Sequence, residues 1–279
     1  MEIRPISPSL ARKAILAICA FLTACRSGDR ISAPTNGVAR DTSADVHTYS
    51  TGFSRNENPI REDGVWIGGS SGGASLREGG HFWHRGRLWG DVQTASGMAF
   101  GVDEPTRFGD PTAILTGAWG PTQTVSATVR IVRTPTGGCC HEVELRLRTS
   151  ISQFRITGYE AYCSVMPHQP YCHIARWNGP AGSYWNMETQ SKDTYLADGD
   201  VIKATVTGTD PAVITLYKNG VEVARAVDSG LPGGGFGAFG PWTSGSPGIG
   251  FYDDADDEWR DFGFSSFTAT DVSSSAVSP

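Results

Sequence analysis

The 279-residue sequence contains no apolar run long enough to cross a bilayer. The apolar run near its N-terminus, Ala14 to Leu22, falls short of the roughly 20 apolar residues that a membrane-spanning helix needs. The rest of the chain has no pattern of an ordinary helix and no repeat of the length found in solenoids or propellers. Its 35 glycines and 10% aromatic residues instead favour short strands joined by tight turns.

The N-terminus has the layout of a secretory signal. A basic start precedes the apolar run, and the sequence LTAC follows at residues 22–25. This ending resembles the lipobox of bacterial lipoproteins, in which the cysteine is lipidated and becomes the first residue of the mature protein. The resemblance implies a signal peptide at residues 1–24 and lipidation of Cys25. The alternative is an ordinary signal peptide in which Cys25 has no such role.

The next segment is expected to tether the protein to a membrane. Residues 25–52 are rich in small and polar residues, which predicts a flexible linker before the folded domain. More than one acyl chain on Cys25 would anchor the protein stably, since a single chain binds weakly. Arg26 stands where lipoproteins kept in the inner membrane often have an acidic residue. We therefore expect an exported protein that is lipid-anchored to the bacterial cell envelope, with the outer membrane or cell surface favoured.

The predicted mature chain is acidic. Residues 1–24 hold three of the 23 basic and one of the 29 acidic residues, so 20 basic and 28 acidic residues remain, a net charge of −8. Such a surface argues against nucleic acid and against polyanionic glycans as partners, because like charges repel.

Export permits disulfide bonds, and four cysteines follow the predicted lipidation site: Cys139, Cys140, Cys163 and Cys172. Cys163 and Cys172 are expected to pair, because a short connection would place them at facing positions on antiparallel strands. Cys139 and Cys140 are left to form a vicinal bond or to stay reduced. A metal site is the alternative for these cysteines, and the absence of a CxxC pair argues against it.

Several stretches alternate between apolar and polar residues, as half-buried strands do. Residues 123–133 place apolar side chains on one face and threonine, serine and arginine on the other. Val143, Leu145 and Leu147 are expected to face inward. The charged residues between them are expected to face outward: Glu142, Glu144, Arg146 and Arg148. The dipeptide Asn219-Gly220 between two strand-like runs predicts a hairpin.

Many short strands between turn signals predict an all-β, two-sheet antiparallel sandwich or jelly roll. The order of motifs is GYEAYC, YCHIARWNG, DGDVIKATVTG, ITLYKNGVEVARAVDSG, SPGIGFY and WRDFGFSSFTATD. This series resembles bacterial domains of the concanavalin A-like lectin/glucanase (laminin-G-like) superfamily. The resemblance covers residues 53–271 and implies a jelly-roll domain there, with residues 272–279 as a disordered tail.

The resemblance implies a fold rather than one activity, because this fold carries lectins, hydrolases, lyases and structural modules. Laminarinase-like members have a Glu-x-Asp-x-Glu strand, whose nearest match, residues 254–258, begins with aspartate. Alginate-lyase-like members combine an Arg-rich strand with a Gln-Ile-His strand, and only the first has a counterpart, at residues 144–148. No catalytic residue is therefore assigned, and a non-enzyme is favoured.

The best candidate ligand site combines aromatic rings with hydrogen-bonding side chains. A ring against the C–H face of a sugar, flanked by amide and imidazole groups, makes a sugar platform. The predicted site consists of Trp177, Tyr184, Trp185, His173 and Asn186. Trp177 is expected to be a core residue, whereas Tyr184 and Trp185 contribute only if they are exposed on one face.

Two acidic groups are further candidates. The candidate acids of a polysaccharide-cleaving enzyme are Glu142, Glu144 and Glu160. The favoured alternative is a solvated sheet face whose ion pairs contribute little. A weak candidate for a structural calcium site consists of Asp253, Asp254 and Asp256. The alternative there is a solvated acidic turn, and no other cofactor is required.

These observations predict a surface-anchored, monomeric, non-catalytic carbohydrate-binding module. Its partners would be a polysaccharide or cell-surface glycan and, through the lipid anchor, a membrane, but not nucleic acid. Two alternatives remain: a polysaccharide-cleaving hydrolase or lyase on the same fold, and a structural or adhesive surface domain without a glycan site.

Overall fold

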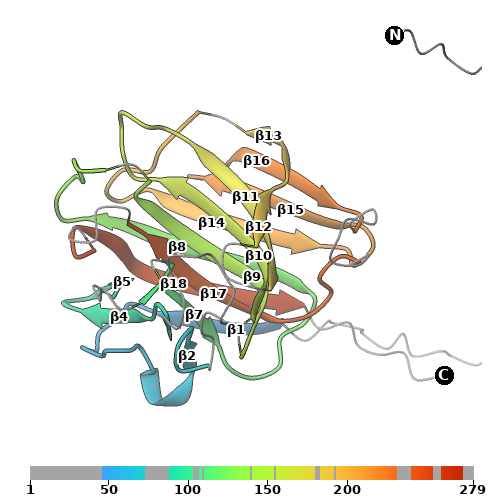
Figure 1. Ribbon diagram of the computed structural model, residues 1–279, viewed down its shortest axis with the longest axis horizontal. Helices are drawn as coiled ribbons and strands as arrows, with labels where there is room; N and C mark the ends of the chain where they lie inside the picture. Colours follow the sequence, from blue (N-terminus) through green and yellow to red (C-terminus); the bar gives the residue numbers. More distant parts are fainter. Residues whose placement is uncertain are drawn as a thin grey trace, which may run out of the picture. The chain divides into compact units, whose positions relative to one another are not determined.

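The computed structural model describes residues 46–72, 88–102, 107–108, 110–138, 140–153, 155–179, 183–191, 193–230, 240–253 and 259–272. These residues form two antiparallel sheets, one short parallel strand pair and a single turn of 3-10 helix, η1 (Glu62–Gly64) (Figure 1). The predicted all-β, two-sheet jelly-roll sandwich is confirmed. None of the helices described is long and apolar enough to span a membrane.

The larger sheet has nine strands. Its order is β13 (Glu188–Ser191), β16 (Val221–Asp228), β15 (Ala212–Lys218), β14 (Val201–Thr207), β8 (Thr122–Ile131), β18 (Phe262–Val272), β5 (Met98–Gly101) and β4 (Val92–Ala95), and β1 (Val46–Thr51) also pairs with β18. β8 and β18 are neighbours in this sheet although they are far apart in sequence, so the sheet depends on long-range strand pairing.

The smaller sheet has seven strands and carries the candidate site. Its order is β12 (Tyr184–Asn186), β11 (Cys172–Gly179), β10 (Arg155–Ser164), β9 (Glu142–Ser152), β17 (Ser246–Tyr252), β7 (Thr112–Leu115) and β2 (Trp66–Gly68). A separate parallel pair joins β3 (Leu88–Trp89) to β6 (Arg107–Phe108). Figure 1 shows the strands of the two sheets lying one over the other.

The hydrophobic core lies between the sheets. The inward residues of β8 meet those of β9, and both sets are almost completely buried: Val125, Ala127, Val129, Val143, Leu145 and Leu147. This confirms the predicted inward side of both strands. Full burial of each large aliphatic side chain contributes about 1.5–3 kcal/mol, which makes this seam a main source of stability.

The predicted Asn-Gly hairpin joins β15 to β16. Asn219 and Gly220 have φ angles of 49° and 80°, the left-handed conformation that both central residues of a type I′ turn need. The Asn219 side chain accepts a hydrogen bond from the backbone N–H of Val201 at 2.8 Å. Local sequence and neighbouring strand therefore specify the same turn.

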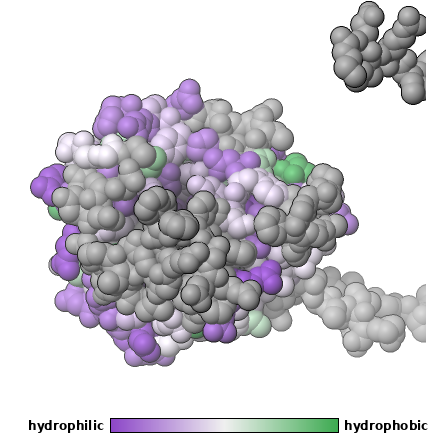
Figure 2. All heavy atoms as spheres, viewed as in Figure 1, coloured by the Kyte–Doolittle hydropathy of each residue, from purple (hydrophilic) through white to green (hydrophobic). Residues whose placement is uncertain are grey.

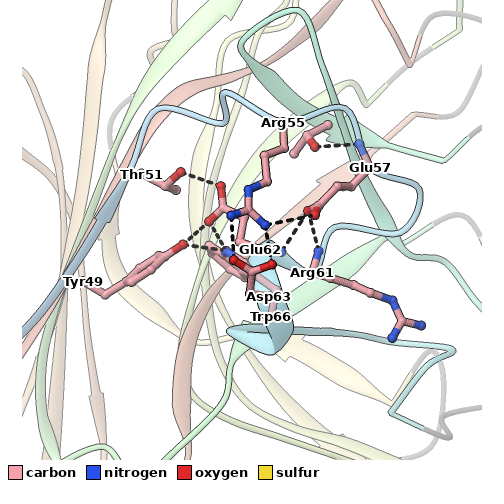
Figure 3. Close-up of polar contacts among 9 residues, drawn as sticks. Tyr49, Thr51, Arg55, Glu57, Arg61, Glu62, Asp63 and Trp66 are labelled. Carbon is pink, nitrogen blue, oxygen red and sulfur yellow. Dashed lines mark hydrogen bonds and ion pairs between the residues drawn. The ribbon is translucent and has the colours of Figure 1, made fainter.

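The folded domain begins earlier than predicted, because β1 lies inside the segment assigned to the tether. The carboxylate of Glu62 accepts hydrogen bonds from the hydroxyls of Tyr49 and Thr51 and, at 2.9 Å, from Nε1 of Trp66 (Figure 3). These bonds attach β1 to the turn before β2. The strand is mostly exposed and polar, so its composition resembles that of a linker.

Cys163 and Cys172 form the predicted disulfide, with a Cα–Cα distance of 4.1 Å. They occupy facing positions in the β10–β11 register, as their spacing implied. Cys140 is also disulfide-bonded, and its partner lies outside the described residues. The predicted signal peptide, Cys25 and residues 273–279 of the predicted tail lie outside them as well.

Candidate functional site

The seven-stranded sheet has a second face, which we call the outer face because it points away from the nine-stranded sheet. Leu145, Ala161 and Ile174 point into the core, so the residues between them lie on the outer face. Facing residues on neighbouring strands share a face, and the register arranges the outer-face residues in rows. One row is Glu144, Tyr162 and His173, and the next is Arg146, Glu160, Ala175 and Asn186.

The charged stripe of β9 is buried, so the expectation of a solvated face is wrong. Glu144 is 1% exposed and Arg146 is completely buried. Alternation identifies two faces of a strand, but it does not reveal that both are covered. Because ions lose hydration on burial, these charges require partners within the protein.

Arg146 is the centre of a group that we call the Arg146 cluster, with Asp110, Glu144 and Glu160. Its Nη2 lies 2.5 Å from Oδ1 of Asp110 and 2.5 Å from Oε2 of Glu144. Its Nη1 donates to Oε2 of Glu160. Three carboxyl groups thus share one guanidinium, with their oxygens within 4.8 Å of one another.

The cluster therefore holds more acid than base. Burial raises the pKa of Asp110 to about 7, although the charge of Arg146 opposes the rise. Burial, followed by the charge of Glu160, raises the pKa of Glu144 well above its usual range. At neutral pH part of the cluster is protonated, which reduces the repulsion between neighbouring carboxylates.

Glu142 extends the acidic group toward the surface. It is half-buried at the start of β9 and accepts a hydrogen bond of 2.6 Å from the hydroxyl of Tyr171. Burial raises the pKa of Glu142 to about 8, while the bond from Tyr171 opposes this. Glu142 is thus a proton-carrying acid near neutral pH.

Trp177 joins the cluster to the aromatic residues. Its Nε1 donates to Oε2 of Glu160, and its ring lies 5.5 Å from the guanidinium carbon of Arg146. Its ring centroid is 4.9 Å from that of Tyr184. Trp177 is buried, as expected of a core residue, but it packs with Trp89 on the outer face rather than between the sheets.

Tyr184 and Trp185 are both exposed, by 49% and 37%, but they do not share a face. Trp185 is opposite Arg176, whose guanidinium binds Asp228 of the nine-stranded sheet. Trp185 therefore lies on the side away from the outer face. Tyr184 is opposite Trp177 and stays on the outer face.

His173 and Asn186 complete the outer-face part of the predicted site. His173 stacks on Tyr171 with ring centroids 5.3 Å apart. The hydroxyl of Tyr162 donates to Oδ1 of Asn186 at 2.9 Å. Four of the five predicted ligand residues therefore share one face, and Trp185 is the exception.

Tyr184 is electrostatically linked to the acidic residues. Burial raises the pKa of its hydroxyl, and the charges of Glu160, Asp110, Glu142 and Glu144 raise it further, in that order. The exposed ring thus lies within the negative field of the cluster. This field makes the surroundings of Tyr184 unfavourable for an anion.

Arg148 leaves the predicted stripe. The β9–β10 register shifts opposite Gly158, and Arg148 has a φ of 47°, so the strand bulges there. Its guanidinium instead donates to the backbone carbonyls of Pro121, Gly208 and Trp242 at 2.6–2.7 Å. Arg148 therefore holds chain segments together and does not belong to the site.

The predicted calcium site is described only in part. Asp253 is buried, with Oδ1 2.9 Å from Nε2 of His141, so it does not lie in a solvated turn. Asp254 and Asp256 lie outside the described residues. In the Arg146 cluster the carboxyl oxygens are close enough for a cation, and the guanidinium already supplies positive charge there.

Sequence reasoning missed Asp110, which the fold brings to the cluster together with Trp89. Nε1 of Trp89 donates to the backbone carbonyl of Asp110 at 2.6 Å, which places both beside the cluster. Neither belongs to a motif, because both are brought to β9 by the fold. The only sequence feature that pointed to this cluster was the charged alternation at residues 142–148, with Glu160 on the next strand.

No family model and no curated protein matches the sequence. Several solved structures are similar. The carbohydrate-binding module CBM66 from Bacillus subtilis is 14% identical, with 66% of this chain and 89% of that chain covered and a TM-score of 0.40. The Emp46p carbohydrate recognition domain in its potassium-bound form is 9% identical, with 74% and 88% covered and a TM-score of 0.40. An inactivated mutant of β-agarase B in complex with agaro-octaose is 11% identical, with 81% and 94% covered and a TM-score of 0.46. At this identity the likeness concerns the fold alone.

Proposed function

We propose that this protein binds carbohydrate on the outer face of its seven-stranded sheet, at Tyr184. The observation that carries the proposal is an exposed Tyr184 ring packed at a tilt against buried Trp177, beside the amide of Asn186 and the Arg146 cluster. An aromatic ring packs against the C–H face of a sugar, while amide and carboxyl groups bind its hydroxyls. Trp177 fixes the ring, which reduces the conformational entropy lost on binding.

The polar surface also favours a hydrated ligand. Among the described residues seen in Figure 2, hydrophilic side chains predominate and hydrophobic ones are scattered. Among the described residues, the exposed large hydrophobic residues other than Tyr184 and Trp185 are six valines, of which only Val46 and Val272 are paired with each other across neighbouring strands. A protein-docking surface would more often carry a contiguous apolar patch.

Affinity electrophoresis tests this function. The full chain carrying Cys25→Ser, which cannot be lipidated there, is run through gels that contain neutral, basic or acidic polysaccharides. We expect retardation by at least one glycan and its loss in Tyr184→Ala. Trp185→Ala is the matched control, because it removes an exposed ring from the same strand on the other face, and retardation should persist. Unaltered migration in every gel, or equal losses in both variants, would contradict the proposed site.

A polysaccharide-cleaving enzyme is the second candidate, favoured by the three close carboxyl groups with raised pKa values among them. A retaining glycosidase uses two carboxyl groups about 5–5.5 Å apart. However, Glu144 and Glu160 are 1% and 4% exposed, so substrate would need the site to open. A reducing-end assay on any glycan that binds distinguishes the two functions. Activity lost in Glu144→Gln or Glu160→Gln with binding retained would favour the enzyme.

The lipid anchor is part of the same proposal. Anchoring through Cys25 would hold the sugar-binding domain at the cell envelope, as a monomer that meets a polysaccharide or surface glycan. Labelling with a radioactive or clickable fatty acid in a bacterial host tests this. We expect label in the wild-type chain and none in Cys25→Ser, and equal labelling of both would exclude Cys25 as the lipidation site.

A further inference from the structure

The charges around Tyr184 narrow the class of sugar, provided that the proposed function holds. Four carboxyl groups act on its hydroxyl: Asp110, Glu142, Glu144 and Glu160. Among the described residues, Arg146 is the only cation within ion-pair distance of any of them. The site therefore has a clear excess of acidic over basic groups.

Arg146 is not free to bind an acidic sugar. Both of its terminal nitrogens are engaged by carboxylates, and the side chain is completely buried. Its Nε–H is buried as well and has no acceptor among the described residues. Arg146 is therefore not accessible to a ligand, and a carboxylate or sulfate on the ligand would add to the negative charge already present.

We infer that the outer-face site prefers sugars that carry a protonated amino group, such as glucosamine residues, over neutral and acidic sugars. An ammonium group on the exposed face of Tyr184 gains a cation–π interaction with the ring. The carboxyl groups behind the ring attract the ammonium through space rather than by direct bonds, because Asp110, Glu144 and Glu160 are buried. Neutral sugars gain only the stacking and hydroxyl contacts.

Proton release is the signature of this preference. A bound ammonium favours the ionised form of nearby carboxyl groups, so it lowers their pKa. Glu142 and Asp110 carry protons near neutral pH because burial raises their pKa to about 8 and about 7. Binding of an aminated sugar should therefore expel protons to the solvent, while binding of a neutral sugar should not.

Isothermal titration calorimetry tests the inference on the full chain carrying Cys25→Ser. The probes are three oligosaccharides of equal length: a β-1,4-linked glucosamine oligomer, its fully N-acetylated counterpart, and a galacturonic acid oligomer. The first two share one backbone and differ in charge. At pH 6 and low salt we expect the glucosamine oligomer to bind about tenfold more tightly than the acetylated one, and the acidic one to bind least. Repeating the titration in buffers of different ionisation enthalpy should show proton release with the glucosamine oligomer only.

Glu142→Gln provides the variant, because Glu142 is half-buried and lies outside the Arg146 cluster. The preference for the aminated oligomer should fall about threefold or more. Glu222→Gln is the matched control, since it makes the same substitution on β16 of the other sheet, where Glu222 pairs with Arg225. If Glu142→Gln does not fold, the wild-type protein is titrated at low and high salt instead. An electrostatic preference for the aminated oligomer should become smaller at high salt.

The outcomes separate this inference from the proposed function. Equal or tighter binding of the acetylated or acidic oligomer would overturn the amino-sugar preference while the site remained a sugar site. A tenfold preference that high salt does not change, or one without proton release, would also overturn it. Failure of all three oligomers and of every polysaccharide in the electrophoresis gels would instead reject carbohydrate binding itself.

Discussion

Arg146 and Arg176 are both completely buried in the seven-stranded sheet, and one strand separates β9 from β11, yet their surroundings differ. Arg176 meets a single carboxylate, with Nη1 2.8 and 2.7 Å from the two oxygens of Asp228. Its Nη2 donates to the backbone carbonyl of Gly240 at 2.7 Å. Charge is balanced one to one, and Nε, like that of Arg146, has no acceptor among the described residues.

The Arg176 network is also closed by neighbouring groups. The hydroxyl of Tyr159 donates to Oδ2 of Asp228 at 2.7 Å and accepts from the backbone N–H of Trp242 at 2.9 Å. The Trp242 ring lies 4.8 Å from the guanidinium carbon of Arg176. This network links the two sheets and leaves no excess charge. The Arg146 cluster has three carboxyl groups for one guanidinium, so balanced burial marks a structural role and acidic excess marks a candidate site.

The largest expected effect comes from removing each arginine. Arg146→Met and Arg176→Met should each lower the free energy of unfolding by about 3–5 kcal/mol near neutral pH, because carboxylates are left buried without a cation. The pH dependence should separate them, since Arg146→Met leaves three carboxyl groups without a cation and Arg176→Met leaves one. Each proton taken up on folding adds about 1.4 kcal/mol per pH unit. Urea unfolding at pH 6, 7 and 8 measures both slopes, and equal slopes would show that the two networks are alike.

The wild-type protein should become less stable as pH rises from about 6 to 9. Asp110 and Glu142 have pKa values raised to about 7 and about 8 in the folded state, so folding favours their protonated forms. Stability from a raised carboxyl pKa is present below the unfolded pKa and is lost as pH rises through the folded pKa. We expect a loss on the order of 2 kcal/mol over this range.

Glu142→Gln should flatten the alkaline part of that profile, because the amide cannot ionise. Asp228→Asn, in the balanced network, should lower stability without flattening it. Thermal unfolding across the range measures each profile. A wild-type stability that rises between pH 7 and 9 would contradict the assignment of protonated carboxyl groups.

Gly250 offers a smaller test of packing against the Arg146 cluster. A Cβ at this position would overlap Oε2 of Glu144 and would lie 2.8 Å from Nε of Arg146. Gly250→Ala should therefore cost about 1–3 kcal/mol. Gly240→Ala is the control in the other network, because nothing lies within 4 Å of its added Cβ and its carbonyl remains. Denaturant titration of both variants measures the free energy of unfolding. An unchanged value in Gly250→Ala would mean that the side chains of the cluster can move to make room for the added methyl group.

The smallest expected effect concerns two tyrosine hydroxyls. Tyr159→Phe removes a bond to Asp228 and an acceptor for the N–H of Trp242, so it should cost about 1–2 kcal/mol. Tyr162→Phe removes one bond to exposed Asn186 and should cost about half as much. Water can replace the partner of Asn186 but not that of buried Asp228. The reverse order in thermal unfolding would weaken the view that the Arg176 network is the more rigid of the two.

Much of the architecture could be predicted from local pattern. Alternation in β8 and β9, the Asn-Gly turn and the Cys163–Cys172 pairing all depend on residues close in sequence, whose geometry follows from strand periodicity and turn conformation. The polar strand β1 escaped prediction because its stability comes from pairing with β18 and from bonds to Glu62. The exposure of Tyr184 and Trp185 was allowed for, but their separation onto two faces depends on the β11–β12 register.

The sequence by itself determined the alternating strands β8 and β9, the inward side of each and the Asn-Gly turn, because side-chain alternation and turn chemistry act over a few residues. Only the tertiary structure decided that the charged side of β9 is buried and that Asp110 joins Glu144 and Glu160 around Arg146. That meeting depends on strands far apart in the chain, and burial, which raises the pKa of the carboxyl groups, is a property of everything packed around them.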